Sequence, residues 1–549
     1  MRAAAIVVAA IVIAACTGRG PQRVGGQPSW RGSDGTTVVT SGAPVTFAPA
    51  SQPAARYNEP LQAPPHTALG DAVTEAVHGA AKAAGMAMPV ADARLFRACA
   101  ELAEIVPEQG NVIYSLVEFA LQRNGIIEPS PHLLVVWSSS TPEEIVGELQ
   151  KHIPKMLADG HSARLGIGSV KRNAKGEHAI VFALQGSYLT TSPIPRALPT
   201  KGAFTLDAVV DARYKDPEVF VTRDNGTTDR VDIERRQAGG FKAKVGCGAR
   251  TGRQQIEITA SDALGSTVLA NFPVWCGTTP PSSLTVTPTS DDEPVTDPAD
   301  AERRLLAMLN RERNAARLPS VAWDDRVAEI ARNYSNEMNT TKVVAHISPT
   351  TGSAADRVRA GKIKTAVVLE NVARAYGLGE AHSGLMNSPG HRANILSHHA
   401  THVGIGVVYG NEVSGRREIF ITQVFTRVPP KVDASQSADE IRKKILVTRK
   451  VNVNAKLTAI AQGMANQLAA GKTREQAYPA VKRQVDALGN KYARVGSVVT
   501  AVSELDSIDG PAILGDAHPD DVGIGAAQGV HPEIGEGAIW IVVLLAENR

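Results

Sequence analysis

The sequence predicts a multidomain α+β protein, and three observations lead to that fold class. At 549 residues the chain is too long to fold around a single core. Apolar residues at helical spacing alternate with strand-like runs in three separate regions, whereas a fourth region holds only short strands. Two segments rich in Gly, Pro, Ser and Thr lie outside these regions and have the composition of a tether and a linker.

The composition of the chain argues against nucleic-acid binding. Charged residues make up 21% of the chain and the formal net charge is only +3, without the concentrated basic face of a nucleic-acid binder. Aromatic residues are sparse at 4%, so the cores are expected to consist of Ala, Val, Leu and Ile. None of the four cysteines forms a Cys-x-x-Cys pair, which excludes a zinc ribbon or a thioredoxin-type motif.

Residues 1–16 are expected to form an export signal. An apolar run from Ala3 to Ala15 follows Arg2 and is too short for a stable transmembrane helix. The run ends at Cys16, and this junction resembles the lipobox of bacterial lipoproteins. That resemblance implies lipidation of Cys16 and a membrane-anchored lipoprotein of the bacterial cell envelope, facing the periplasm or the exterior. The alternative is an ordinary secretory peptide; either way the chain lies where disulfides persist.

The next stretch divides into a tether and a first folded unit. Residues 17–87 are expected to be a flexible tether with a helix near 67–86. Residues 88–186 alternate helical and strand-like patterns and predict a small α+β unit. Cys99 lies on an apolar helix face within this unit and is expected to be a small buried hydrophobe rather than a nucleophile.

Residues 200–276 predict a β-sandwich of immunoglobulin-like type, because short β-branched or alternating runs recur there between turn residues. Cys247 and Cys276 each lie at the end of a predicted strand, so we expect a disulfide between them. Such a module serves as a spacer or a binding platform. A proline-rich second linker is expected at 277–296.

Residues 297–428 contain the most specific motifs of the chain. Asp297-Pro298 opens an amphipathic helix with a capping aspartate and a proline in the first turn, and a second amphipathic helix follows Trp323-Asp324. After these helices the strings AHISP, LENVA, NSPGHRANIL, VGIGVVYG and IFITQVF occur in order. This series resembles the CAP superfamily (cysteine-rich secretory proteins, antigen 5, pathogenesis-related proteins) in its bacterial SCP-like branch. The resemblance covers about a quarter of the chain and implies an α-β-α sandwich.

The resemblance also implies a binding cleft. In the family, two histidines and two acidic residues line a cleft that can hold zinc or another divalent ion. His346 of AHISP matches the first histidine and Glu370 of LENVA matches the first glutamate, so these two residues are the candidate metal ligands. The second histidine aligns with Phe420 and the second glutamate aligns near Ser388, so the family tetrad is incomplete. His391, Asn371 and Arg392 complete the expected cleft, with His391 as a substitute ligand.

Other interpretations of these residues remain open. Ser388-Pro389 is a good cap and first turn, so NSPGHRANIL can serve simply to start a helix. Ser388 beside His391 is the local candidate for a hydrolytic nucleophile, although a serine at a helix start normally uses its hydroxyl for capping. Glu380 and His382 on the preceding helix are expected on a solvated face, with a contribution to the cleft as the alternative. His398, His399 and His402 are expected in a loop or on the surface, with a weak adventitious metal site as the alternative.

Three segments begin with a similar Gly-Ile-Gly string and continue into an apolar strand, which indicates an internal repeat. They are Gly166–Leu184, Gly404–Phe425 and Gly523–Leu545. Residues 437–549 therefore predict a third α+β unit. Neither flanking unit carries AHISP, LENVA or SPGHR, so we expect two degenerate CAP-like units around one that retains part of the cleft.

The sequence favours a binding role over an enzymatic one. The leading hypothesis is an exported, lipid-anchored binding module for an envelope component, a small apolar ligand or another protein. The alternatives are a divalent-metal-dependent envelope hydrolase and a structural envelope protein with a vestigial cleft. No cofactor is established by the motifs, and a divalent metal such as zinc is implied by the family resemblance alone.

Overall fold

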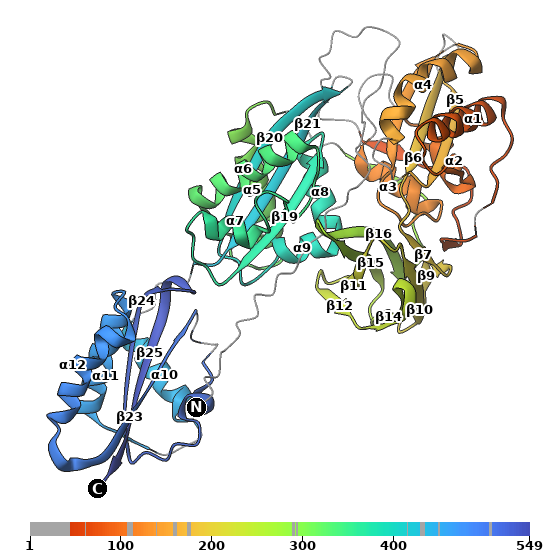
Figure 1. Ribbon diagram of the computed structural model, residues 1–549. Helices are drawn as coiled ribbons and strands as arrows, with labels where there is room; N and C mark the ends of the chain where they lie inside the picture. The colour runs from red at the N-terminus through yellow and green to blue at the C-terminus, as the bar shows by residue number, and fades with distance from the viewer. Residues whose placement is uncertain are drawn as a thin grey trace.

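Four folded units follow one another along the chain, and three of them repeat one sheet topology (Figure 1). The computed structural model describes residues 44–549 except 61, 107–112, 139, 158–161, 173–176, 288–290, 292–294, 414–415, 429–433, 448–450, 504 and 506–507. The predicted export signal and Cys16 lie outside the described residues. Among the helices that are described, none combines the length and the apolar character needed to cross a bilayer.

The first unit is a four-stranded sheet between two helical layers. The sheet order is β3-β5-β6-β4, where β3 runs parallel to β5 and the other pairs are antiparallel. Separate apolar clusters cover its two faces, one built with α1 and α4 and the other with α2 and α3. The bounds are α1 Ala68–Ala83, β3 Val90–Ala91, α2 Ala93–Ala103, α3 Tyr114–Arg123, β4 His132–Ser138, α4 Pro142–Leu157, β5 Arg164–Lys171 and β6 His178–Gln185.

The central unit has the same sheet order, β18-β20-β21-β19, again with a short parallel first strand. Helices α5, α8 and α9 cover one face, and α6 and α7 cover the other. This α-β-α sandwich agrees with the predicted fold. The bounds are α5 Pro298–Ala315, β18 Ala322–Trp323, α6 Asp325–Thr341, α7 Ala354–Ala360, β19 Val368–Ala375, α8 Leu378–Asn387, α9 Pro389–Ile395, β20 His402–Val413 and β21 Arg416–Thr426.

The third unit repeats the arrangement with the order β22-β24-β25-β23. It lies at one end of the molecule, with the central unit between it and the rest (Figure 1). The bounds are α10 Ala434–Ile445, β22 Asn452–Val453, α11 Ala455–Ala469, α12 Arg474–Asp486, β23 Tyr492–Val502, α13 Gly510–Leu514, β24 Asp521–His531 and β25 Gly535–Asn548.

The Gly-Ile-Gly strings have the same structural role in all three units. A Cβ added at Gly168, Gly406 or Gly525 would lie 2.1–2.2 Å from a backbone nitrogen of the helix that crosses the strand. Because only glycine lets the helix approach the sheet this closely, the repeated motif marks a helix-on-strand contact.

Between the first and central units lies a β-sandwich of two sheets, ordered β13-β14-β10-β7 and β12-β11-β15-β16-β9. A disulfide joins Cys247 and Cys276, the pair expected from the sequence. The immunoglobulin-like type of this sandwich stays a prediction. The bounds are β7 Leu189–Thr191, β9 Ala197–Leu198, β10 Ala203–Val210, β11 Lys215–Thr222, β12 Thr228–Val231, β13 Ile233–Arg235, β14 Gly240–Gly246, β15 Gly252–Asp262 and β16 Gly265–Cys276.

The structure differs from the sequence at the expected tether and linker. Within residues 17–87, β1 (Val45–Phe47) pairs with β17 (Leu284–Val286) of the expected linker, and β2 (Arg56–Tyr57) pairs with β8 (Ile194–Pro195). Helix α1 belongs to the first unit rather than to a tether. Phe47 and Tyr57 are 1% and 0% exposed. Burial of these two aromatic side chains therefore holds the segment in place, although the residues around them are rich in Gly and Pro.

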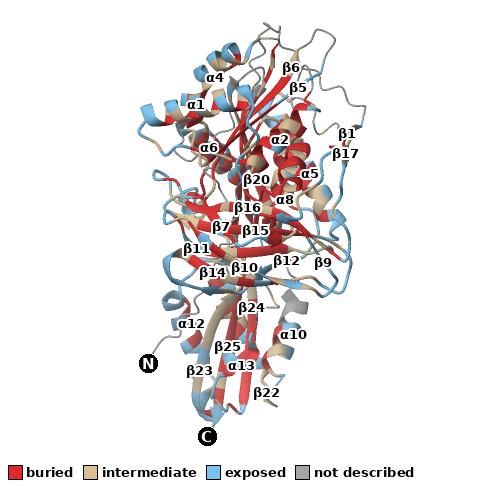
Figure 2. Cartoon of the chain, turned by 90° about the vertical axis from the view of Figure 1, so that its right-hand side faces the viewer, coloured by how far each residue is buried: buried red, intermediate tan, exposed pale blue. Residues whose placement is uncertain are grey.

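Each unit has its own buried centre. Buried residues run along the strands at the centre of each unit, whereas exposed residues lie on the outer helices and turns (Figure 2). Cys99 is fully buried and not disulfide-bonded, and burial raises the pKa of its thiol, as fits a structural residue.

Candidate functional site

His346 and Glu370 meet in the central unit. His346 lies in the loop after α6, and Glu370 lies on β19. The Nδ1 atom of His346 is 2.9 Å from Oε1 of Glu370, and the two residues are only 7% and 5% exposed. The structure therefore brings together the two residues predicted as metal ligands, in a buried position.

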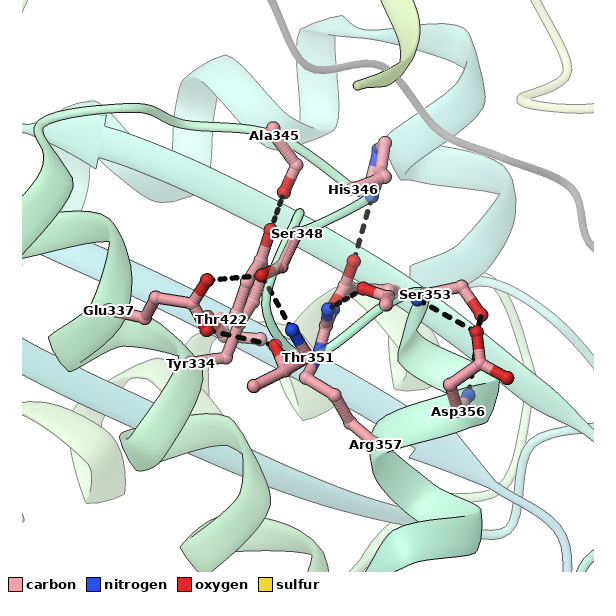
Figure 3. A network of polar contacts seen from close by, with 12 residues as sticks. Tyr334, Glu337, Ala345, His346, Ser348, Thr351, Ser353, Asp356, Arg357 and Thr422 are labelled. Atoms are coloured by element: carbon pink, nitrogen blue, oxygen red, sulfur yellow. Dashed lines mark hydrogen bonds and ion pairs between the residues drawn. The ribbon is translucent and has the colours of Figure 1, made fainter. Parts of the chain in front are cut away.

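The second oxygen of Glu370 is taken by Arg357 of α7. The same guanidinium donates to the carbonyl oxygen of Gly352 at 2.6 Å. It lies 3.4 Å from the centre of the Tyr334 ring, and both side chains are drawn in Figure 3. Burial, and next the charge of Glu370, raise the pKa of Tyr334, so its hydroxyl stays protonated and donates to the carbonyl oxygen of Ala345. Arg357 is thus a central member of the site.

The sequence interpretation missed Arg357. The available signal was Ser353 followed three residues later by Asp356, which starts a helix through a capping box just before LENVA. Arg357 and Arg359 look equivalent in the sequence, but the structure buries Arg357 and leaves Arg359 exposed.

A second polar network holds the loop that carries His346. Glu337 of α6 accepts hydrogen bonds from the hydroxyls of Ser348 and Thr351, the latter at 2.8 Å. The Ser348 hydroxyl accepts from the backbone nitrogen of Thr350 at 2.9 Å. It also accepts from the backbone nitrogen of Thr351 at 2.8 Å (Figure 3). This turn fixes the position of the imidazole relative to β19.

His391 and Asn371 lie beside this pair. The ring centroids of His346 and His391 are 6.4 Å apart, and both residues are buried. Asn371 donates to the carbonyl oxygen of His391 at 3.2 Å and to Oε1 of Gln423 at 3.1 Å. Asn394 donates to the carbonyl oxygen of Glu370 and to Oδ1 of Asn371, both at 3.0 Å. These bonds attach α9 to the sheet.

Arg392 does not join this group, which corrects the expected cleft. Successive residues of a helix point in different directions, and Arg392 extends to the opposite side of α9 from the sheet network. There it lies against Gly226 in the β11–β12 turn of the sandwich and lines a separate cavity. Burial lowers the pKa of Arg392, and the charge of Glu312 opposes that effect.

The two positions that break the family tetrad have other roles. Phe420 is fully buried in an apolar cluster with Tyr334, Met338 and Val372. The Ser388 hydroxyl caps α9, lies 2.8 Å from Nδ1 of His391, and donates to Glu257 of β15. Because its proton is held by a carboxylate and not by the imidazole, Ser388 lacks the arrangement of an activated nucleophile.

The donor set does not fit a resident divalent metal. His346 and Glu370 supply two ligands, and the Arg357 cation already neutralises the carboxylate. Zinc sites in proteins use three or four protein ligands. In the part of the chain that the structure describes, no group of three or more His, Cys, Asp or Glu residues is placed to hold a metal ion.

The other candidate polar residues lie outside this network. His382 holds the pKa of Glu312 below its usual range by hydrogen bonding, and Glu380 accepts from the backbone nitrogen of Tyr376 at 3.3 Å. His398 and His399 are exposed, with ring centroids 3.7 Å apart and planes tilted by 43°, and His402 contacts the Thr401 hydroxyl at 3.0 Å.

A cavity of about 1400 Å³ lies on the far side of α9 from His346. The end of α5, helix α7, the start of β19 and the C-terminal part of α9 form most of its wall, and the sandwich and the third unit contribute the rest. The larger aliphatic side chains that line it are Leu318, Val358, Ile363, Val367, Val368, Leu369 and Leu396, and the alanines are Ala315, Ala316, Ala355, Ala366 and Ala393. Five basic residues, Arg359, Lys362, Lys364, Arg392 and Arg427, outnumber the acidic Asp224, Glu312 and Glu533.

Comparisons with known proteins agree with this geometry. Residues 306–425 match the model of the Cysteine-rich secretory protein family, CAP. Two curated relatives come from Bacillus subtilis (strain 168): an uncharacterized membrane protein, YlbC, 34% identical over 108 residues, and an uncharacterized protein, YkwD, 32% identical over 113 residues. Each alignment covers 20% of this chain, and the chain spans 31% and 44% of these relatives, respectively.

Two solved structures are similar at low identity. An extracellular protein with an SCP domain from Bacillus anthracis str. Ames is 18% identical, with 50% of this chain and 92% of that chain covered and a TM-score of 0.22. A cysteine-rich secretory protein from Staphylococcus aureus is 11% identical, with coverages of 50% and 91% and a TM-score of 0.20. The family match and the α-β-α sandwich together show that the chain contains a CAP domain, which is the central unit.

Proposed function

We propose that this chain is an exported binding protein whose CAP domain recognises an anionic, amphipathic component of the cell envelope. The observation that carries the proposal is the cavity beside α9, because its volume and its chemistry both suit such a ligand. Small-molecule sites in proteins are concave, largely apolar and supplied with a few polar groups, and they measure about 300–1,000 Å³. At about 1400 Å³ this cavity exceeds that range, so it accommodates a long chain or a headgroup with its tail.

The lining of the cavity indicates which part of the ligand lies where. Aliphatic side chains from α7, β19 and the end of α9 offer an apolar wall for a hydrocarbon tail. Arg392, Arg427 and the lysines of the α7–β19 connection supply positive charge for a carboxylate or phosphate headgroup. Binding is favoured over hydrolysis because the His346 network contains no activated nucleophile and its donors are used internally.

The proposal places the protein outside the cytoplasm, anchored through a lipid on Cys16. Two sequence features support this: the apolar run that ends at Cys16, and the Cys247–Cys276 pair, which suits an oxidising compartment. Metabolic labelling with a palmitate analogue provides the test: the full chain is expected to take up label, and Cys16→Ser is expected to take up none. Equal labelling of both would contradict the anchor.

The cavity itself is tested with two probes that differ only in charge, oleate and oleyl alcohol. Oleate is expected to bind about tenfold more tightly, a difference of roughly 1.4 kcal/mol. Ala316→Trp places an indole in the cavity from the end of α5 and should abolish binding, whereas Ala360→Trp on the exposed end of α7 should not. Equal affinity for both probes, or unchanged binding in Ala316→Trp, would overturn the proposed ligand class.

A further inference from the structure

The face of the CAP domain that carries His346 is covered by the β-sandwich of the same chain. The hairpin between β15 and β16 reaches this face: the backbone nitrogen of Ile347 donates to the carbonyl oxygen of Leu264 at 2.9 Å. Gly265 follows with a φ of +105°, and a Cβ there would lie 3.1 Å from Cβ of His346. The hairpin tip therefore sits directly against the histidine.

A second set of contacts joins the same sheet to the start of α9. Glu257 of β15 accepts from the backbone nitrogen of Gly390 at 3.0 Å and from the Ser388 hydroxyl. Asn271, the cross-strand neighbour of Glu257 on β16, donates to the carbonyl oxygen of Asn387 at 3.1 Å. Thus the segment 387–390 is bound by two polar side chains from one patch of the sandwich.

The burial of Glu257 on the outer surface of the sheet indicates that the sandwich is adapted to this contact. Ile256 and Ile258 belong to the sandwich core, so strand alternation turns Glu257 to the outer surface of the sheet. A carboxylate on an outer surface would normally be hydrated, yet Glu257 is 0% exposed because α9 covers it. Burying it is tolerated because donors of the CAP domain replace water.

We propose that the β-sandwich is a lid: it docks on the surface formed by His346–Ile347 and Asn387–Gly390 and covers the His346–Glu370 pair. While docked, it shields His346, whose Nε2 atom is buried without a hydrogen-bond partner among the described residues. Undocking exposes that imidazole and the start of α9 together. His346 does not line the proposed ligand cavity, and the lid does not depend on the ligand class proposed for it, although residues 224–228 of the same sandwich form part of the cavity wall.

The test measures histidine reactivity in the full-length chain. Diethyl pyrocarbonate is added, and peptide mass spectrometry follows the modification rates of His346 and, as an exposed internal reference, His398. Two variants weaken docking: Glu257→Lys, which places a cation against the donors of α9, and Asn271→Asp, which replaces a donor by an acceptor. Glu234→Lys is the control, because its side chain is 70% exposed on the other sheet of the sandwich.

In the wild-type chain His346 is expected to react much more slowly than His398. Each docking variant should raise the His346 rate about tenfold, because each removes a hydrogen bond that holds the sandwich on residues 387–390, while Glu234→Lys leaves it unchanged. Circular dichroism and the Cys247–Cys276 disulfide report whether the sandwich still folds, and Asn271→Asp decides the question if Glu257→Lys does not fold. An unchanged His346 rate in a folded docking variant, or rapid modification of His346 in the wild type, would overturn the lid.

Discussion

At the scale of single residues, the Glu370 carboxylate is the centre of the polar site. One oxygen faces the His346 imidazole and the other faces the Arg357 guanidinium, and all three side chains are buried. A buried carboxylate that accepts a hydrogen bond from a guanidinium is fixed in position. The group therefore holds the loop after α6, helix α7 and β19 together instead of offering free ligands to a metal.

Replacing Arg357 by alanine should destabilise the CAP domain by about 3–5 kcal/mol, because removing one partner of a buried pair leaves the other charge uncompensated. Arg359→Ala is the matched control on the same helix: its ion pair with Asp356 is exposed, so the change should be within about 0.5 kcal/mol. The free energy of unfolding of both variants is measured in urea, with hydrogen exchange in residues 368–375 as the probe. Equal effects of the two substitutions would contradict the role given to Arg357.

At the scale of elements, the contact between one helix and one glycine-bearing strand recurs in all three related units. The strand order is the same in each, and each places two glycines of the Gly-Ile-Gly string under the helix that follows the short first strand. Only the central copy has His346, Glu370 and the SPGHR segment. The repeated architecture is thus separate from the polar site, which occurs in the central copy.

Gly406→Ala tests this contact in the CAP domain. The new methyl group would lie 2.2 Å from the backbone nitrogen of Arg332, so α6 must move from the sheet, at a cost of about 1–3 kcal/mol or more. Gly384→Ala in α8 adds a methyl group where the nearest atom is 4.0 Å away, and it should stabilise the helix by about 0.5–1 kcal/mol. The midpoint of unfolding of each variant is compared with that of the wild type. A Gly406→Ala variant with an unchanged midpoint would contradict the close contact between α6 and the sheet.

At the scale of the whole molecule, segments expected to be flexible join the units to one another. Strand β1 near the start of the described chain pairs with β17 between the sandwich and the CAP domain, with Thr46 opposite Thr285. Phe47 packs against Phe119 of the first unit at a centroid distance of 5.8 Å. The sandwich contacts the first unit on one side, where the backbone nitrogen of Asn271 donates to the carbonyl oxygen of Ile127 at 2.8 Å. It contacts α9 on the other side, so its position over the CAP domain depends on both contacts.

Phe47→Ala should release residues 44–50 and the paired strand β17. Truncating a fully buried phenylalanine costs about 3–5 kcal/mol, whereas Met88→Ala, at a side chain that is 58% exposed, should cost little. Limited proteolysis followed by mass spectrometry is the measurement, with new cleavage expected near 284–286 in Phe47→Ala only. Protection equal to that of the wild type would show that β1 does not hold the linker.

Motifs in the sequence predicted several residues of the site, but they did not predict which residues contact one another in the folded protein. AHISP and LENVA identified His346 and Glu370, and the capping interpretation of Ser388 agrees with its place at the start of α9. Arg357 and Glu257 escaped notice because each becomes important only through a partner distant in the chain. Glu257 lies 131 residues from Ser388, and local sequence patterns carry no information about such a pair.

The sequence by itself determined the order of the units and the Gly-Ile-Gly repeat, because helical and strand periodicities and close-packing glycines are local properties. The α-β-α plan of the CAP domain was implied by the resemblance of its motifs to the family. The tertiary structure alone decided that Arg392 faces a cavity, that Arg357 neutralises Glu370, and that the sandwich covers His346. Those outcomes depend on which surfaces meet when separate units dock. Such contacts are set by the shape and charge of whole faces, which no single stretch of sequence contains.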